Sequence, residues 1–197
     1  MTVAPLVADF VKATSRACDV RVTDLRARAS TKAIFAALRG PLVPRDRPGA
    51  RVAACVHLDE VTQQDRFEAG VLRDLLAAFR ALEPHLAWYH RIGNAPGANA
   101  AYAQGHANAM IIGPGGLVPH EAVWLGVSLL APAVRYPDHT HPPEETYLVL
   151  SDGDFYQEGR GWFTPGAGGS FYNPPCILHA MRSGNAPLFA VWALRAV

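Results

Sequence analysis

The segment Tyr136–Tyr147, which reads YPDHTHPPEETY, decides how the second half of this chain is interpreted. On an extended backbone, residues two apart point to the same face, so His139 and His141 can face a single point. Beyond a Pro-Pro turn, Glu145 and Tyr147 share a face in the same way. The pattern predicts two consecutive strands that direct two imidazoles, a carboxylate and a phenol toward one cavity.

A third histidine, His179, follows far along the chain, behind the turn-like sequence Asn173-Pro174-Pro175. Three imidazoles and one carboxylate suit Zn²⁺, Fe²⁺, Mn²⁺, Co²⁺ or Ni²⁺ and leave coordination positions open for substrate. The sequence therefore predicts one divalent transition metal ion, without naming the element. The expected ligands are His139, His141, Glu145 and His179. The alternative is a group of hydrogen-bonded polar residues at the mouth of a barrel.

The residue pattern changes after about residue 105, where glycine and proline recur at short intervals. Between them lie β-rich runs at residues 109–112, 123–130, 146–150, 154–157, 169–172 and 189–194. Many short strands separated at regular intervals by turn residues are typical of a small barrel or a sandwich. We therefore expect a mainly β fold over residues 105–197, with the metal site inside it.

The first part of the chain has helical spacing instead. Residues 3–40 look helical, with a second helix over about 30–38, and a proline-rich loop follows at 41–50. The clearest helix is expected over about 64–82. We expect residues 1–104 to form an α-helical N-terminal extension that packs on the barrel. It could close one end of the cavity or form a homodimer contact, and the sequence leaves both open.

Composition restricts the classes of function. The chain has 197 residues, of which 50% are hydrophobic and 18% charged, with a net charge of +1. This is a globular composition without a basic stripe, so nucleic acid is not an expected partner. No apolar stretch approaches the ~20 residues that span a bilayer. Three scattered cysteines favour a reducing compartment, and we expect a soluble cytoplasmic protein. Cys176 is expected to be a buried structural thiol.

The histidine and glutamate spacing resembles the cupin superfamily, a small β-barrel or jelly roll. Its two motifs are G(X)5HXH(X)3,4E(X)6G and G(X)5PXG(X)2H(X)3N. Six residues stand at matching places: His139, His141, Glu145, Gly168, Pro174 and His179. Four positions depart from the motifs. Ala133 and Cys176 replace glycines, Gly153 comes one residue late, and Ser183 replaces the final asparagine. These are hairpin and supporting positions, and the departures leave the expected ligands intact.

Residues 136–180, the stretch YPDHTHPPEETYLVLSDGDFYQEGRGWFTPGAGGSFYNPPCILHA, further resemble the bacterial cupin-type dimethylsulfoniopropionate lyases of the DddQ type. The helical extension and total length agree with this. The resemblance implies cleavage of dimethylsulfoniopropionate (DMSP) to dimethyl sulfide and acrylate. It also implies that the four expected ligands hold the metal, that Tyr147 is the general base, and that Tyr136 lines the substrate site.

The residues support this chemistry on physical grounds. A tyrosine beside a divalent cation can lose its proton near neutral pH, and the phenolate could take a proton from a carbon next to a metal-bound carboxylate. The sulfonium of the substrate needs an electron-rich wall, which aromatic rings supply. Tyr136, Trp162 and Trp192 are the candidates. Ordinary core packing is the alternative for both tryptophans.

The same ligand set also permits other functions. An iron-dependent cupin dioxygenase acting on a small thiol or acid would use the same residues but would need oxygen. A non-catalytic cupin that binds a small ligand is a third hypothesis. Release of dimethyl sulfide without oxygen separates the first two, and substitution of Tyr147 addresses the third.

Overall fold

The computed structural model describes residues 3–196, beginning with two long helices. Helix α1 spans Val3–Arg21 and α2 spans Leu25–Ala37. The second helix begins earlier than expected because the Asp24 side chain caps it, accepting hydrogen bonds from the backbone N–H groups of Arg26 and Ala27. Arg21, at the end of α1, donates to the carbonyl oxygen of Gly168 at 2.7 Å, and so ties this helix to a barrel loop.

The segment between α2 and the barrel contains short helical elements. They are η1 (Ala53–His57), α3 (Leu58–Val61), η2 (Gln64–Arg66), α4 (Val71–Leu82), η3 (Glu83–His85) and α5 (Tyr102–Gly105). The helix expected over 64–82 begins only at Val71. Phe67 is extended, and Gly70 has a φ of 148°, which interrupts the helical path before α4.

Eight strands form two antiparallel sheets within residues 3–196. They are β1 (His106–Ile112), β2 (Val123–Leu130), β3 (Glu144–Val149), β4 (Asp154–Gln157), β5 (Gly161–Phe163), β6 (Ser170–Asn173), β7 (His179–Arg182) and β8 (Leu188–Arg195). The larger sheet has the order β1-β2-β8-β3-β6, and the smaller has the order β5-β4-β7. The expected mainly β cupin barrel with N-terminal helices is therefore confirmed. The β-rich runs of the sequence did not include β5, which has only three residues.

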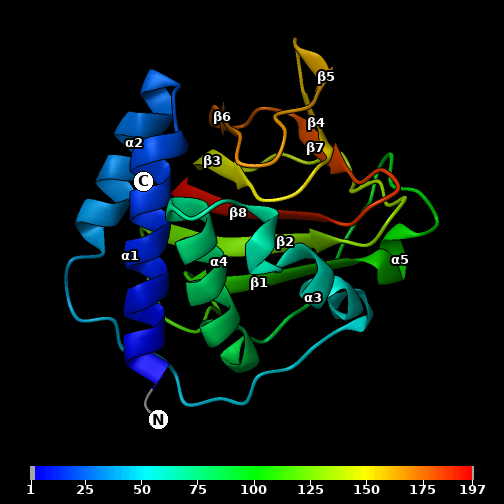
Figure 1. Ribbon diagram of the computed structural model, residues 1–197. Helices are drawn as coiled ribbons and strands as arrows, with labels where there is room; N and C mark the ends of the chain where they lie inside the picture. Colours follow the sequence, from blue (N-terminus) through cyan, green and yellow to red (C-terminus); the bar gives the residue numbers. More distant parts are fainter. Residues whose placement is uncertain (1–2, 197) are drawn as a thin grey trace.

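The helices cover one face of the larger sheet, and Figure 1 shows α1 and α4 side by side in front of β1 and β2. Phe79 of α4 lies at the centre of this contact. Its ring centroid is 6.2 Å from that of Phe10 in α1 and 4.9 Å from that of Phe189 in β8. All three rings are buried, and burying such a side chain contributes roughly 1.5–3 kcal/mol. The helices thus share one core with the barrel, while the boundary at residues 104 and 105 stays a prediction.

A second hydrophobic cluster fills the inside of the barrel, between the two sheets. Its aromatic members include Tyr136, Tyr147, Phe155, Phe171 and Trp192, all buried. The Tyr147 ring stacks on that of Phe171, with centroids 5.0 Å apart. The expected site therefore lies within an aromatic interior, on the side of the large sheet away from α1 and α4.

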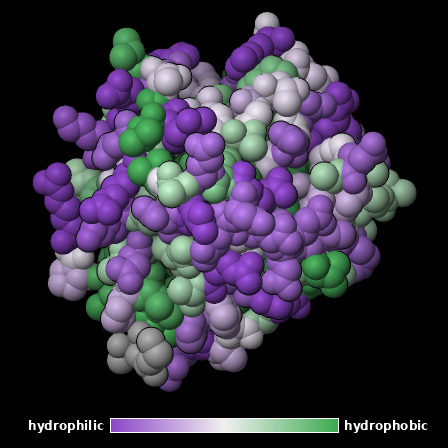
Figure 2. Space-filling view, viewed as in Figure 1, coloured by the Kyte–Doolittle hydropathy of each residue, from purple (hydrophilic) through white to green (hydrophobic). Residues whose placement is uncertain are grey.

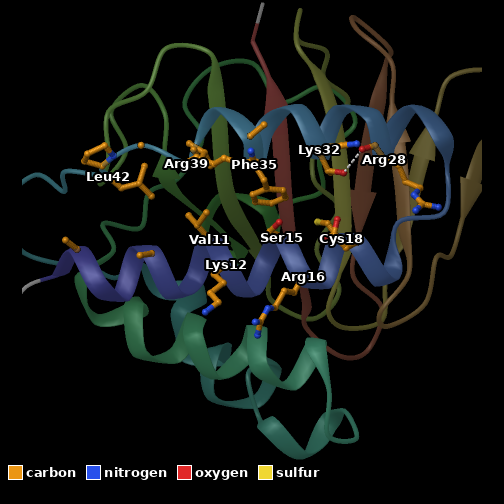
Figure 3. A pocket seen from close by; sticks show the side chains of 18 of the residues that line it. Val11, Lys12, Ser15, Arg16, Cys18, Arg28, Lys32, Phe35, Arg39 and Leu42 are labelled. Carbon is orange, nitrogen blue, oxygen red and sulfur yellow. Dashed lines mark hydrogen bonds between the residues drawn. The ribbon is translucent and has the colours of Figure 1, made fainter.

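The outer surface is largely hydrophilic on the face drawn in Figure 2, with small separate hydrophobic patches. A groove of about 1240 Å³ runs between α1 and α2. Figure 3 shows its basic side chains, among them Lys12 and Arg16 on α1, Lys32 on α2, and Arg39 just beyond the end of α2. In the described chain, no helix combines the length and the hydrophobicity needed to cross a bilayer.

Candidate metal centre and catalytic pocket

Three of the expected metal ligands converge inside the barrel. The Nε2 atoms of His141 and His179 each lie 3.4 Å from Oε2 of Glu145. One ligand atom of each residue lies within 4.8 Å of the other two. Glu145 and His179 are buried, and the His141 side chain is 18% exposed. This arrangement brings a turn before β3, the start of β3 and the start of β7 to one point.

Backbone pairing explains why the two histidine segments meet. His139 and His179 form an antiparallel bridge, with each backbone N–H donating to the carbonyl oxygen of the other residue at 3.0 Å. Residues directly opposite on antiparallel strands hold their side chains close together. The two imidazole centroids are accordingly 4.0 Å apart.

Hydrogen bonds also fix how each imidazole is oriented. Each Nδ1 atom lies 2.8–2.9 Å from a carbonyl oxygen two residues away, as found for His139 with Pro137, His141 with Pro143, and His179 with Ile177. A carbonyl oxygen only accepts, so each Nδ1 carries the proton. In the neutral ring, Nε2 is then an unprotonated donor atom available to a metal.

The donor atoms fit a divalent metal ion. The Nε2 atoms of His141 and His179 are buried without a hydrogen-bond partner. Unprotonated nitrogens that face a carboxylate oxygen repel it unless a positive charge lies between them. His139 stands outside this group of three, with its ring centroid 6.2 Å from that of His141. It lines the same cavity, and its role as the fourth ligand stays a proposal.

A second set of hydrogen bonds holds Glu145 in place. Asn173 Nδ2 donates to Glu145 Oε2 at 2.9 Å, and Gln157 Nε2 donates to Asn173 Oδ1 at 2.6 Å. Burial raises the pKa of the Glu145 carboxyl, but the nearby imidazoles of His141 and His179 and the hydrogen bond from Asn173 outweigh it and lower the pKa to about 2. The carboxylate is therefore ionised and oriented before any metal binds.

The pKa values of the three histidines are shifted in different directions, although all three lie in the same cavity region. Burial lowers the pKa of His139 to about 3, with the charge of His179 acting in the same direction. Burial also lowers the pKa of His179. For His141 burial acts in that direction too, but Glu145 outweighs it and the pKa is raised. His139 and His179 are thus neutral at pH 7, as metal ligands must be.

A cavity of about 240 Å³ adjoins this centre. Fourteen residues line it: Tyr89, Arg91, Asn108, Met110, Trp124, Ser128, Tyr136, His139, His141, Glu145, Tyr147, Met181, Trp192 and Leu194. Tyr136, Tyr147 and Trp192 therefore line the same cavity as His139, His141 and Glu145, and their roles stay predictions. Burial and the negative charge of Glu145 raise the pKa of the Tyr147 phenol well above its ordinary value.

Trp162 does not lie among these lining residues. It sits on β5 in the smaller sheet, with the guanidinium of Arg182 4.3 Å and that of Arg135 5.5 Å from its ring centroid. Two cations already lie near this ring, which makes it unsuited to hold a sulfonium.

The chain matches one known protein family over most of its length. The sequence model of the dimethylsulfoniopropionate lyase family matches residues 26–190, more than four fifths of the chain. The chain belongs to the dimethylsulfoniopropionate lyase family. The resemblance seen in the sequence is therefore confirmed at the level of the family.

Two relatives carry names from this lyase family. DddL of Cereibacter sphaeroides is 28% identical over 141 residues, which cover 71% of this chain but only 57% of DddL. DddQ of Ruegeria pomeroyi is 26% identical over 168 residues, covering 85% of this chain and 82% of DddQ. The crystal structure of that DddQ has the same fold, with a TM-score of 0.76 at 21% identity over 98% of this chain and 92% of the other.

The departures of this chain from the cupin motifs have a structural explanation. Ala133 and Cys176 stand where the motifs have glycine, and their φ values are 58° and 61°. These are left-handed conformations that glycine adopts without strain. Cys176 is exposed, so the expectation of a buried thiol was wrong. Ser183, in place of the motif asparagine, accepts from the Val134 N–H at 2.9 Å and donates to the Ala131 carbonyl at 2.6 Å.

Several residues that line this cavity were not predicted from the sequence. Tyr89 and Arg91 come from the N-terminal part, because the Tyr89 backbone pairs with Asn108 of β1. Asn108 and Ser128 project from β1 and β2 into the same cavity. The available signal was a polar residue in the interior of each largely apolar strand, at Asn108 in HANAMII and Ser128 in VWLGVSLL.

Proposed function

We propose that this protein cleaves dimethylsulfoniopropionate to dimethyl sulfide and acrylate by β-elimination. The observation that carries the proposal is that a buried phenol, Tyr147, lines the same cavity as His141 and Glu145, two donors that converge with His179. Membership of the DMSP lyase family supports the choice of substrate.

His141, Glu145 and His179 would hold the metal, with His139 as the fourth ligand. When bound, a divalent cation would supply the positive charge that attracts the substrate carboxylate and makes a tyrosinate accessible near neutral pH. Zinc, iron(II), manganese, cobalt and nickel all accept three imidazoles and a carboxylate. The firm orientation of Glu145 and the imidazoles means that these side chains need little rearrangement to bind it.

Tyr147 would act as the general base. Its raised pKa means that the metal-free site keeps the phenol protonated, so the base forms only in the loaded protein. Its phenolate oxygen removes the proton from the carbon next to the substrate carboxylate. The C–H electron pair becomes the double bond of acrylate, and the carbon–sulfur bond breaks, with its electrons leaving on neutral dimethyl sulfide.

Aromatic rings in the pocket would bind the sulfonium. Tyr136 and Trp192 present buried rings to the cavity, and each such contact contributes ~0.5–2 kcal/mol to binding a cation. Arg91 also lines the cavity, and its positive charge would attract the carboxylate end and repel the sulfonium end. These residues would bind the substrate in a single orientation, with its carboxylate toward Arg91 and its sulfonium toward the aromatic rings.

A headspace assay tests the proposal. Purified protein, stripped and reloaded with each divalent metal in turn, is incubated with DMSP with and without oxygen. We expect equal release of dimethyl sulfide in both atmospheres, together with one acrylate for each molecule released. Turnover only in oxygen would favour an iron-dependent dioxygenase acting on a small thiol or acid. No release with any metal would end the proposal.

A further inference from the structure

A line of hydrogen bonds crosses three neighbouring strands and ends on the hydroxyl of Tyr136. The Trp192 indole N–H donates to Ser128 Oγ at 3.0 Å, and the Ser128 hydroxyl donates to Asn108 Oδ1 at 2.6 Å. The Asn108 amide then donates from Nδ2 to the Tyr136 hydroxyl oxygen at 3.2 Å. Asn108, Ser128 and Trp192 are 5%, 3% and 7% exposed, so these hydrogen bonds are buried.

The chemistry of the first donor fixes the direction of the whole line. An indole N–H can only donate, so Ser128 Oγ must accept from Trp192. The Ser128 proton is then free to donate, and the acceptor beside it is the Asn108 carbonyl oxygen. This determines which way the Asn108 amide faces, because its NH₂ group must point to Tyr136.

Sheet register places the members of this line opposite one another. Asn108 of β1 pairs directly with Ser128 of β2, and Gly126 of β2 pairs with Trp192 of β8. A Cβ atom on Gly126 would overlap the Trp192 ring. The absence of a side chain at Gly126 therefore lets the indole lie across β2 with its N–H at Ser128.

The line controls where the proton of Tyr136 can point. A phenol hydroxyl lies near the ring plane, and its oxygen accepts from Asn108 on one side. Its hydrogen is then directed to the other side. The structure shows no hydrogen bond between the Tyr136 hydroxyl and the neighbouring Tyr102 hydroxyl. Tyr136 lines the cavity beside His139, which leaves an acceptor bound in the cavity as the partner.

From this geometry we infer that Asn108 is a positioning residue, held by Ser128 and Trp192, that makes the Tyr136 hydroxyl a hydrogen-bond donor to a carboxylate in the pocket. This inference rests on the proposed function for the identity of that carboxylate. It explains why two polar side chains stand in the interior of strands that are otherwise apolar.

The hydrogen bond from Trp192 to Ser128 can be tested by a measurement that does not depend on enzyme activity. In a ¹H–¹⁵N spectrum of the metal-loaded protein, the Trp192 indole signal is assigned by its loss in Trp192→Phe. We expect Ser128→Ala to move this signal upfield, as loss of its acceptor requires. Ser128→Thr, which keeps the hydroxyl, should leave the signal near its wild-type position. A signal that does not respond to Ser128→Ala would overturn the inference.

The role of Asn108 is tested by binding of acrylate, an unreactive carboxylate. In Asn108→Asp the introduced carboxylate only accepts, so it captures the Tyr136 proton and withdraws it from the pocket. We expect acrylate to bind about tenfold more weakly, the effect of one lost hydrogen bond. Tyr136→Phe should cause the same loss, and the double variant should be no weaker than either single variant.

Kinetics with DMSP separate positioning from a general structural defect. Because the lost donor binds the carboxylate, Asn108→Asp should raise KM about tenfold and change kcat far less. Losses that multiply in the double variant, or a wild-type Kd for acrylate in Asn108→Asp, would contradict the role of Asn108. Failure of the wild-type protein to release dimethyl sulfide is a separate result, which would contradict the proposed function while the indole signal still reports on the line.

Discussion

The backbone bridge between His139 and His179 joins the two halves of the candidate metal centre. These residues exchange two N–H···O=C hydrogen bonds of 3.0 Å, although they are far apart in the sequence. The bridge sets the two imidazoles 4.0 Å apart and brings His179 Nε2 to 3.4 Å from Glu145 Oε2. The centre therefore depends on correct pairing of the segment before β3 with β7.

Metal removal should destabilise the folded protein. A ligand that binds only the folded state stabilises it by ~2.7 kcal/mol when present at a hundred times its Kd. We expect a chelator to lower Tm and a divalent transition metal to restore it. His141→Gln should abolish this response, whereas His120→Gln, at a site remote from the pocket, should retain it. Equal Tm values with and without metal in the wild-type protein would contradict the metal centre.

Tyr147→Phe should remove catalysis and leave the metal in place. The substitution deletes only the hydroxyl, so the stacking on Phe171 is preserved. Loss of a general base lowers kcat by roughly 10²–10⁴-fold. Metal content, measured by elemental analysis, should equal that of the wild-type protein. A variant that keeps normal turnover would exclude Tyr147 as the base.

The metal-free protein should lose stability as the pH falls below neutrality. His139 has a folded-state pKa of about 3 against an ordinary value of 6.5, so between these values the unfolded chain binds a proton that the folded one does not. Stability is therefore full above pH 6.5 and declines toward pH 3, by ~1–2 kcal/mol at pH 5. Glu145, with a pKa lowered to about 2, extends the loss below pH 4.5.

Chemical denaturation across this pH range measures the effect. His139→Gln carries no titrating group and should show a shallower dependence between pH 6.5 and 4.5. A variant with the same slope as the wild-type protein would show that His139 is not held neutral in the folded state.

Glycine at the two left-handed positions should stabilise the protein. Ala133 and Cys176 have φ values of 58° and 61°, a conformation that costs roughly 1–2 kcal/mol for a residue with a Cβ. Glycine loses more chain entropy on folding, which offsets ~0.5–1 kcal/mol of the gain. We expect Ala133→Gly and Cys176→Gly each to raise the free energy of unfolding by up to ~1 kcal/mol. Ala131→Gly, at a nearby residue without positive φ, should lower it.

The two tryptophans should differ in their effect on substrate binding. Trp192 lines the cavity, whereas Trp162 lies near Arg135 and Arg182 outside it. We expect Trp192→Leu to raise KM for DMSP by about tenfold, since a cation–π contact contributes ~1 kcal/mol or more when desolvated. Trp162→Leu should leave KM unchanged. A larger effect of Trp162→Leu on KM would indicate that the sulfonium binds at the smaller sheet instead.

Local sequence patterns predicted those parts of the fold that depend on near neighbours. The runs at 123–130 and 154–157 coincide with β2 and β4, because apolar and β-branched residues between turns favour strands on their own. The helix expected from residue 64 begins at Val71, where Gly70 overrides the apolar spacing. Strand β5 is held in place by its partner β4, and its own three residues carry too little signal.

The sequence by itself determined that His139, His141, Glu145 and Tyr147 would be directed to one cavity, because alternation along an extended backbone is a local property. Only the tertiary structure decided that Trp192 lines this cavity while Trp162 does not, and that Asn108, Ser128 and Arg91 join it. These residues belong to segments distant in sequence, and their meeting depends on strand order and register. Such pairing is set by the packing of whole sheets, which no short stretch of the chain encodes.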